Sequence, residues 1–508
     1  MGWQRISIIG GMSKLAGFAY TPQNVRELDR IAIQEVGIDG YELMSRAGRA
    51  AFNATGTRFP DARRWLILCG AGNNAGDGYV IARLARQAGL DVTVAALGDP
   101  IRLSGAAGRA YGEFIQTGGV AVPFDAGLLN TAELIVDALL GTGLDRPLQT
   151  TYLDAVEKVS QTPVPIVAVD IPSGLNGLNG EVMGAALRAQ LTVTFVGLKQ
   201  GFFVGNGPDY VGDLVFDDLD VPFDAVREVP RSLRVYRQLN LNRLLPVRER
   251  TAHKGDFGHV LVVGGNIGMA GAARMAGEAA LRAGAGLVTV ATRPENLAAI
   301  NGQCPELMCV GVEKPRDLAD VLKRATVIAL GPGLGQDLWA ASLVRKLLRA
   351  PQPKVIDADA LNHIAHKKPK PRDDWILTPH PGEAARLLRT DTAAIQADRI
   401  AAVTELVRLY GGAVVLKGRN TLIASADSGT TVIPAGNPGM ASAGMGDVLT
   451  GIIAGVLAQT SGRNLVGAAA AGAYVHACAG DAAAKSGERG IIATDLLTHL
   501  KPCLNDSG

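Results

Sequence analysis

The sequence predicts an α/β protein built from two different domains, and three observations support this prediction. Short apolar runs that suit buried strands alternate with helical patterns along most of the chain, which is typical of parallel sheets with helical crossovers. The 508 residues exceed the usual length of one domain. The 63 glycines follow no collagen-like period, and in an α/β protein such an excess indicates tight turns and phosphate-binding loops.

The composition argues against several classes of protein. Hydrophobic residues make up 47% and charged residues 19%, which allows a large core and argues against disorder. A net charge of +2 argues against a nucleic-acid binder, and no run approaches the ~18 apolar residues of a membrane span. The five cysteines form no Cys-x-x-Cys pair, which disfavours a zinc site or disulfide framework and predicts a cytoplasmic protein.

We place the first domain at residues 20–223 and the second at residues 235–508. Acidic residues and prolines interrupt the regular pattern between them, so residues 224–234 are predicted to be a linker. Residues 1–19 have only a short apolar run and no signal-peptide pattern. We expect them to be a leader, either disordered or translated from a start codon placed too early.

The elements of the first domain follow from local patterns. Thr21 suits an N-cap and Pro22 the first helical position, so a helix begins there. A glycine loop after the first strong strand leads into a helix over 79–88. The apolar runs predicted to be strands are 65–69, 92–96, 134–136, 166–169 and 192–195.

The second domain repeats this logic without repeating the sequence. Its predicted helices include 270–283, 395–410 and 447–458. The predicted strands are 260–263, 288–290, 327–330, 354–356, 375–377, 413–416 and 421–423. Parallel sheets bind ligands beyond the carboxyl ends of their strands, so the loops that follow these runs are the candidate sites.

The strongest local signal lies in the second domain, where a glycine-rich loop, 437–446, leads into an apolar helix. Gly444 and Gly446 leave backbone N–H groups free, and with the positive end of the helix dipole these can bind an anion. A carboxylate at Asp447 suits proton abstraction from a hydroxyl that then attacks a terminal phosphorus. Asp is also a common N-cap, so Gly-x-Gly-Asp alone would favour a structural reading.

Further loops favour the functional interpretation of Gly-x-Gly-Asp over the structural one. The loops 331–335, 378–383 and 417–421 each follow a predicted strand, and the last offers a cation, an amide and a hydroxyl to a nucleotide. Together with 253–258 and 264–272 they resemble the ribokinase-like family, and within it the ADP-dependent NAD(P)H-hydrate dehydratases. The resemblance implies a ribokinase-like α/β domain that uses Mg²⁺ and ADP, with Asp447 as a catalytic residue.

The resemblance also implies binding residues for this domain. Those for the nucleotide are Lys417, Gly418, Arg419, Asn420, Thr421 and Gly446. Those for the hydrated nicotinamide are Ala272, Gly335, His380 and Asp447. His363 and His366 lie in a basic stretch that we expect to be a solvated loop.

In the first domain the segment Gly70–Gly78 follows a strand and contains two asparagines and an aspartate. A glycine loop of this kind is weak evidence for dinucleotide binding, and its amides and carboxylate also suggest oxygen coordination. Asp137 and Asp170 end two separate apolar strands and are expected to converge at one edge of the sheet. Each could instead cap a turn, but the combination with the asparagines favours a functional site.

This pattern resembles the NAD(P)H-hydrate epimerase family over residues 20–223, which implies a Rossmann-like three-layer αβα domain. It implies K⁺ bound by Asn74, Asp137 and Ser173, and Asp170 as a catalytic acid/base. The implied substrate-binding residues are Asn73, Asn74, Ala75, Gly76, Asp77, Gly141, Thr142, Gly143, Leu144, Asp145, Arg146, Pro147 and Asp170. Ala75 replaces a glycine that the family usually has, and a positive φ there would strain it by ~1 kcal/mol or more.

The two resemblances together imply a repair enzyme for hydrated nicotinamide cofactors. It would interconvert the epimers of NADHX and NADPHX and dehydrate the (S) form with ADP, giving AMP and phosphate. We expect a homo-oligomer that binds neither nucleic acid nor membrane. The alternatives are a ribokinase-like kinase of a small alcohol or vitamin precursor, and a first domain that binds without catalysis.

Overall fold

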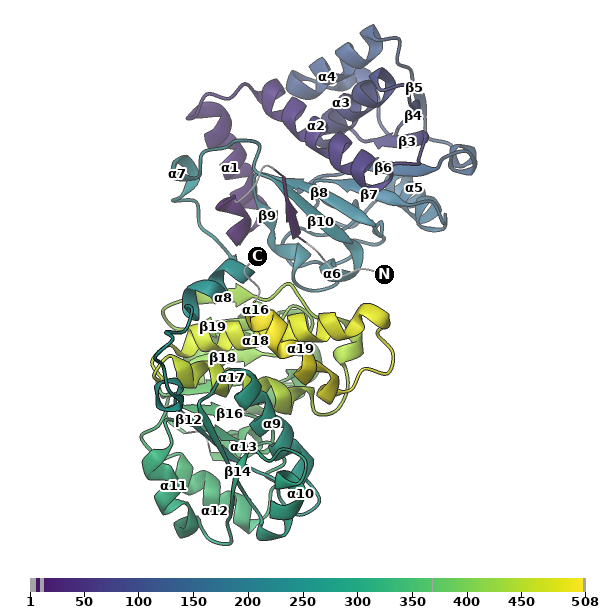
Figure 1. The fold of residues 1–508 in the computed structure, drawn as a ribbon. Helices are drawn as coiled ribbons and strands as arrows, with labels where there is room; N and C mark the ends of the chain where they lie inside the picture. The colour runs from purple at the N-terminus through teal and green to yellow at the C-terminus, as the bar shows by residue number, and fades with distance from the viewer. Residues whose placement is uncertain (1–5, 10–12, 368, 506–508) are drawn as a thin grey trace. The chain divides into compact units, whose positions relative to one another are not determined.

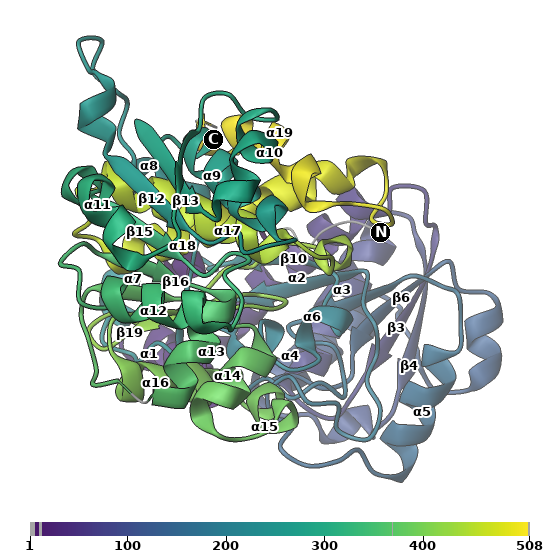
Figure 2. The ribbon, with the colours of Figure 1, turned by 90° about the horizontal axis from the view of Figure 1, so that it is seen from below.

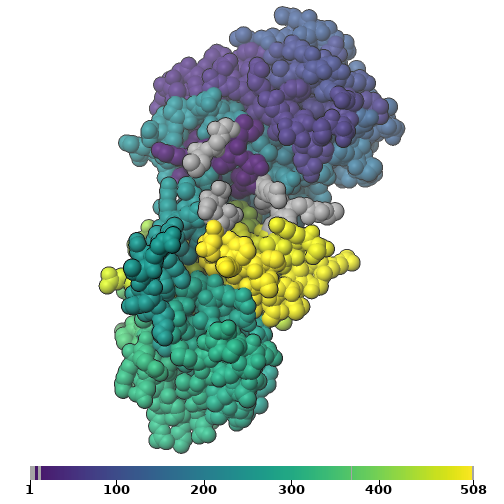
Figure 3. Space-filling view, in the orientation of Figure 1, coloured from purple at the N-terminus to yellow at the C-terminus, as the bar shows by residue number. Residues whose placement is uncertain are grey.

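The computed structural model describes residues 6–9, 13–367 and 369–505, which are the coloured residues of Figure 3. The chain forms two compact units, residues 1–234 and 235–508. Among the described helices, none is long and apolar enough to cross a membrane.

The first unit contains an eight-stranded sheet in the order β1-β10-β8-β7-β6-β3-β4-β5. Every neighbouring pair in it is parallel. The strands are β1 Ile6–Ile8, β3 Arg64–Cys69, β4 Asp91–Ala96, β5 Ala121–Pro123, β6 Leu134–Ala138, β7 Ile166–Val169, β8 Leu191–Phe195 and β10 Asp213–Asp217. The predicted strands are all present, and the parallel α/β fold is confirmed.

Helices cover both faces of this sheet (Figure 1). Because successive strand side chains point to opposite faces, Cys69 packs against Gly78 of one helix layer, while Leu66 and Leu68 join Val156 of the other in a buried cluster. The first layer contains α2 Gly40–Arg58, α3 Asn73–Gln87 and α4 Gly105–Gln116, and the second contains α5 Thr150–Ser160. This is the three-layer arrangement expected.

A smaller ribbon forms beside α1 Pro22–Gln34. Thr21 caps that helix as predicted, because its hydroxyl accepts a hydrogen bond from the Asn24 N–H at 3.2 Å. The ribbon pairs β2 Phe18–Tyr20 with β9 Leu198–Lys199 and with β11 Leu233–Val235. The short helices α6 Gly207–Tyr210 and α7 Phe223–Val226 complete the unit.

The prediction of a leader over residues 1–19 is wrong for those of its residues that the structure describes. Ile6–Ile8 pairs in parallel with β10, and Leu15 and Ala16 are fully buried in the core. Residues 1–5 and 10–12 lie outside the described residues. The predicted linker, 224–234, is likewise partly folded, because Leu233 is buried and pairs with Ala19 of β2.

The strands of the second unit follow the order β14-β13-β12-β15-β16-β17-β18-β19-β20, parallel as far as β18 and antiparallel after it. They are β12 His259–Val263, β13 Leu287–Thr292, β14 Met308–Gly311, β15 Val327–Leu330, β16 Lys354–Ile356, β17 Trp375–Leu377, β18 Ala413–Leu416, β19 Leu422–Ser425 and β20 Gly429–Val432. All the predicted strands are present.

Two helix layers sandwich this sheet, and Figure 2 shows α9 on one side and α12 and α13 on the other. The first layer consists of α9 Ala270–Arg282, α17 Met445–Gln459, α18 Leu465–Ala483 and α19 Ala493–Asn505. The second includes α11 Ala319–Arg324, α12 Leu338–Leu347, α13 Ala358–Lys367, α14 Pro381–Leu388 and α16 Arg399–Tyr410. The remaining helices are α8 Gln238–Leu244, α10 Leu297–Asn301 and α15 Thr392–Ala397.

The helices α9 and α17 pack closely because small residues face each other. A methyl group added at Gly451 would lie 2.1 Å from the Ala276 carbonyl oxygen, and one at Gly455 would lie 2.5 Å from that of Ala280. The predicted helix over 395–410 is wrong at Asp398, whose backbone is extended. Asp398 ends α15 and caps α16 by accepting a hydrogen bond from the Ala401 N–H at 2.9 Å.

Candidate active sites

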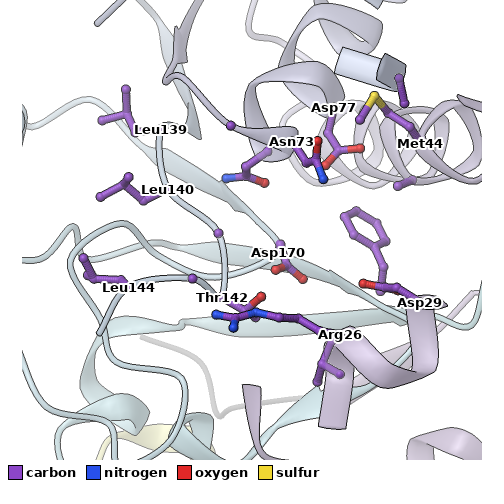
Figure 4. Close-up of a pocket in the computed structure, with 18 of the residues that line it drawn as sticks. Arg26, Asp29, Met44, Asn73, Asp77, Leu139, Leu140, Thr142, Leu144 and Asp170 are labelled. Carbon is purple, nitrogen blue, oxygen red and sulfur yellow. The ribbon is translucent and has the colours of Figure 1, made fainter. Parts of the chain in front are cut away.

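The first unit has a cavity of about 1030 Å³ beyond the carboxyl ends of its strands (Figure 4). It brings together most of the residues that the sequence predicted to bind substrate. Those that line it are Asn73, Asn74, Asp77, Gly141, Thr142, Gly143, Leu144, Asp145, Arg146, Pro147 and Asp170. Ala75 and Gly76 do not line it, since both are buried in α3.

The segment expected to be a glycine loop is mostly helical, because α3 begins at Asn73. Ala75 is fully buried and is not among the residues with positive φ, so the strain expected for a left-handed alanine does not arise. Gly76 does not have a positive φ, so a glycine is needed there because its neighbours leave no room for a side chain. A methyl group there would lie 2.5 Å from the Met44 sulfur.

Three oxygen-bearing residues, Asn74, Asp137 and Ser173, are buried where the neighbouring parallel strands β3, β6 and β7 end, and this group is called the polar pocket below. The Asp137 carboxylate, fully buried, accepts hydrogen bonds from the Ser173 hydroxyl at 2.6 Å and the Ser173 N–H at 2.7 Å. Burial raises the pKa of Asp137 to about 6. The amide oxygen of Asn74 is buried and has no hydrogen-bond partner.

This pocket fits a weakly hydrated monovalent cation. A buried carboxylate with only neutral donors and an orphaned amide oxygen are both unfavourable without a partner. A bound cation would satisfy both groups. The predicted ligands Asn74, Asp137 and Ser173 therefore suit K⁺ chemically.

The floor of the cavity carries a cluster of charged groups. The Lys199 ammonium is fully buried, forms an ion pair with Asp170 and donates to the Thr194 hydroxyl at 2.7 Å. Asp170 has a φ of 68°, an uncommon backbone conformation for a residue other than glycine. Such conformations persist where the surroundings impose them, and they concentrate at functional sites.

Two more carboxyl groups face this cluster, and sequence reasoning missed the first of them. Burial, followed by the charge of Asp170, raises the pKa of Asp29 to about 7, although Lys199 opposes this. Burial and the charges of Asp170 and Asp29 raise the pKa of Asp77 well above its ordinary value. Asp29 resembles any surface acid of an amphipathic helix. Lys199, also missed, had one signal: it is a lysine that ends an apolar run.

In the second unit the predicted anion loop and helix are present. Gly444, with a φ of 87°, is the N-cap of α17, and Asp447 lies in the first turn. A methyl group at Gly446 would lie 3.3 Å from the Lys417 ammonium. The loop therefore lies beside a cation from the carboxyl end of β18.

A buried ionic network supports this cation. The Asp357 carboxylate accepts hydrogen bonds from the Lys417 ammonium at 2.7 Å and the Thr450 hydroxyl at 2.8 Å. Glu383 lies 3.6 Å from the same ammonium. Burial lowers the pKa of Lys417, but the two carboxylates outweigh burial and raise it.

The network also acts on Asp447. The pKa of Asp447 is raised to about 7, mainly by burial and next by the negative charge of Asp357, while the positive charge of Lys417 lowers it. A carboxyl with this pKa can accept a proton at neutral pH more readily than an ordinary aspartate. Asp357 was missed from the sequence, although it directly follows the predicted strand 354–356.

A second missed residue, Arg399, supports the predicted nucleotide loop. Its buried guanidinium donates to the carbonyl oxygens of Leu416 at 3.2 Å and Lys417 at 3.4 Å, and also to those of Arg419 and Asn420. Burial lowers the pKa of Arg399 to about 10. The Thr421 hydroxyl donates to the Gly418 carbonyl at 3.0 Å and closes the turn.

The predicted substrate residues lie on neighbouring loops of the same sheet edge. Ala272 packs against Gly333, and a methyl group added at Gly333 would lie 3.0 Å from the Ala272 methyl group. The Gly335 N–H donates to Asp359 at 2.8 Å. The predicted solvated loop at His363 is wrong, because His363 is buried in α13 and its Nε2 lies 3.3 Å from the Gly335 carbonyl oxygen.

His380 caps α14 at the end of β17. Its Nδ1 accepts a hydrogen bond from the Gly382 N–H at 3.0 Å, and the backbone N–H of His380 donates to the Glu383 carboxylate at 2.8 Å. Burial lowers the pKa of His380. The His380 imidazole faces the same edge as the Lys417 network.

Comparisons with known proteins match both units. The model of the NAD(P)H-hydrate dehydratase family matches residues 260–502, and that of the YjeF-related protein N-terminus matches residues 40–201. A ribokinase-like superfamily protein from Enterococcus faecalis has a similar solved structure, with 32% identity and a TM-score of 0.50, covering 54% of this chain and 95% of its own.

Two curated relatives are similar over nearly the whole chain. A bifunctional NAD(P)H-hydrate repair enzyme from Coxiella burnetii is 48% identical, covering 96% of this chain and 99% of the relative. One of the same description from Escherichia coli is 43% identical, covering 95% of this chain and 93% of the relative. Because these relatives match over nearly the whole chain and both family models match as well, the chain belongs to the family of bifunctional NAD(P)H-hydrate repair enzymes.

Proposed function

We propose that this protein repairs hydrated nicotinamide cofactors, with an epimerase site in the first unit and an ADP-dependent dehydratase site in the second. The observation that carries the proposal is the placement of Asp447 in the first turn of α17, beside the Lys417 ammonium. An acceptor for a hydroxyl proton and a cation for a phosphate lie side by side there.

In the second unit, the Asp447 carboxylate would accept the proton of the ring hydroxyl of the (S)-hydrate. The hydroxyl oxygen then attacks the terminal phosphorus of ADP, and AMP leaves. Lys417 and the free N–H groups of the 444–446 loop stabilise the charge on the transferred phosphoryl group. Phosphate is a far better leaving group than hydroxide, so phosphate leaves together with a proton from the neighbouring ring carbon, and the dihydropyridine ring is restored.

Ala272, Gly335 and His380 would hold the nicotinamide, and Gly418, Arg419, Asn420 and Thr421 would hold the nucleotide. Mg²⁺, when bound, would screen the phosphate charges. Among the described residues no group of three or more His, Cys, Asp or Glu side chains is arranged to hold a metal. We therefore propose that Mg²⁺ binds mainly through the nucleotide's own oxygens.

In the first unit, Asp170 would act as a proton acceptor and donor while the hydroxyl-bearing carbon inverts. Asn74, Asp137 and Ser173 would hold K⁺, which organises the neighbouring wall. The hydrate would contact Asn73, Asp77 and the loop 141–147, and Ala75 and Gly76 would act through packing. A dehydratase that accepts one epimer needs this activity to use the other.

The test is incubation of the full chain with ADP and separately purified (R)- and (S)-hydrates of NADH. We expect both to regain the absorbance of reduced nicotinamide, with one AMP and one phosphate per NADH. Consumption of ATP with a small alcohol, and no recovery of NADH, would instead establish a kinase. Without ADP, failure to interconvert the epimers faster than the spontaneous rate would make the first unit a non-catalytic module.

The remaining expectations concern the state of the protein in the cell. A cytoplasmic location is in keeping with the cysteines at 69, 304, 309, 478 and 503, none of which forms a disulfide within the described part of the chain. Both this location and a homo-oligomeric state stay predictions. Size-exclusion chromatography with light scattering tests the latter.

A further inference from the structure

The cavity of the first unit holds more acid than its one buried ammonium can neutralise. Figure 4 shows Asp29, Asp77 and Asp170 around the same space, from three different segments of the chain. The Lys199 ammonium already contacts Asp170, the Thr194 hydroxyl and the Phe195 carbonyl oxygen. All three of these hydrogen bonds are made to Asp170 or to residues of β8 and the residue that ends it, and none is made to Asp29 or Asp77.

Asp29 differs from Asp170 in its surroundings. Within the described part of the chain, its carboxyl group has no ion-pair partner and no hydrogen-bond donor in contact with it. It projects from α1 into the cavity, one helical turn after Arg26, which also lines the cavity. The charged groups nearby are thus Lys199, Asp170, Asp77 and Arg26, and only Asp170 is paired with Lys199.

The epimerisation needs two groups in opposite protonation states. When the hydroxyl leaves from one face of the ring, an acid must protonate its oxygen. When water adds to the opposite face, a base must take one of its protons. Two carboxyl groups whose surroundings separate their pKa values can fill these roles.

We propose that Asp29 is a second catalytic residue of the epimerase site and acts as the acid–base partner of Asp170. The proposal rests on the epimerase function proposed above for the first unit. Asp29 and Asp170 share one proton between them. The group that holds it at the start of a turnover depends on which epimer is bound.

In one direction, the Asp29 carboxyl donates its proton to the ring hydroxyl oxygen. The bond from carbon to oxygen breaks, water leaves, and the ring nitrogen lone pair forms a carbon–nitrogen double bond. Water adds to the other face while Asp170 takes its proton, and the double-bond electrons return to nitrogen. One water leaves and one enters, and the proton that moved from Asp29 to Asp170 returns in the reverse reaction, or through solvent before another turnover in the same direction.

Asp77 suits a different task. It lies in the first turns of α3, where burial and both other carboxylates disfavour its ionised form. A carboxyl whose ionised form is disfavoured in this way is poorly suited to alternate between acid and base. It can donate a lasting hydrogen bond to the substrate.

The experiment compares full-length wild type with Asp29→Asn and Asp29→Glu, following interconversion of the epimers without ADP by chromatography. Glu27→Gln is the matched control, because Glu27 is on the same helix but pairs with Arg30 at the surface. We expect Asp29→Asn to lower kcat at least ~100-fold with a KM within threefold of wild type, as for loss of a general acid. Asp29→Glu should recover part of kcat, and Glu27→Gln should behave as wild type.

Two further measurements separate a chemical role from a structural one. The limb of the wild-type pH profile near neutrality should be absent in Asp29→Asn. In heavy-oxygen water each inversion by wild type should incorporate one solvent oxygen, and Asp29→Asn should lose inversion and incorporation together. Circular dichroism and the melting temperature of the full chain report whether the first unit of each variant is folded, and Asp29→Ser replaces Asp29→Asn if the latter fails this check.

The outcomes distinguish the two proposals. If wild type interconverts the epimers and Asp29→Asn keeps more than a third of wild-type kcat, the role of Asp29 is refuted while the epimerase remains. A rise in KM alone would also refute it, since Asp29 would then only bind substrate. If wild type does not interconvert them, the function proposed for the first unit fails.

Discussion

The pH dependence of ADP-driven repair should expose the carboxyl at position 447. Burial and Asp357 raise its pKa from 3.8 to about 7, which corresponds to about 4 kcal/mol against the ionised form. The reaction needs that form, so kcat/KM for the (S)-hydrate should rise with pH. The ionised fraction grows from ~0.1 at pH 6 to ~0.9 at pH 8, so the rise should be about ninefold.

ADP also ionises in this pH range, so the rise in kcat/KM could come from ADP or from Asp447. A variant separates these two origins of the pH dependence. Asp357→Asn removes one carboxylate that raises the pKa of Asp447, so the limb should move down by ~0.5 to 1 pH unit. A limb caused by ADP would not move. The assay is initial recovery of NADH absorbance from purified (S)-hydrate with Mg²⁺ and ADP. A profile that is flat from pH 6 to 8, or a limb that does not move in Asp357→Asn, would refute the assignment of Asp447 as the base.

Three other predictions test separate parts of the molecule. Lys417→Met should weaken ADP binding ~10- to 100-fold by calorimetry, because a charged hydrogen bond to phosphate is lost. An unchanged Kd would show that Lys417 does not bind the nucleotide. Asn74→Ala should raise the K⁺ concentration for half-maximal epimerisation at least ~10-fold without affecting repair of the (S)-hydrate, because the amide oxygen is the proposed ligand. An unchanged K⁺ dependence would argue against a K⁺ site at Asn74. Gly451→Ala should lower the free energy of unfolding by ~1–3 kcal/mol, and with it the melting temperature, because the added methyl group overpacks against Ala276. In the control, Gly112→Ala in α4, the added methyl group has no neighbouring atom within 4 Å, so the stability should be equal or higher.

Much of the fold could be predicted from local patterns. Buried strands such as Ile166–Val169 are continuous apolar runs bounded by turn residues, and this strand has the bounds that the sequence predicts. Two strands that escaped prediction, Ala121–Pro123 and Met308–Gly311, lie at sheet edges and have no buried residue. A third, Asp213–Asp217, lies inside its sheet but alternates buried with half-buried residues between two acids. The break at Asp398 escaped because a cap is decided by one side chain, whereas helical periodicity extends over many.

The candidate sites were predictable where function follows the ends of strands. Asp170 and Lys417 directly follow apolar runs, and the sheet edge gathers them. Asp357 also directly follows an apolar run, but its position alone did not show its role, and Asp29 and Arg399 lack even this signal. The roles of all three arise from contacts between distant segments. The Thr450 hydroxyl, for example, reaches Asp357 across 93 positions of the sequence, and no local pattern records such a contact.

The interlocked glycines and alanines of α9 and α17 have a mechanical consequence. Backbones in van der Waals contact cannot slide or rotate past each other without collision, so the two helices form a single stiff strut. One helix starts at the loop that carries the proposed nicotinamide residues and the other at the loop that carries the proposed phosphate residues. The close packing therefore holds the starts of α9 and α17, and with them these two loops, at a fixed separation.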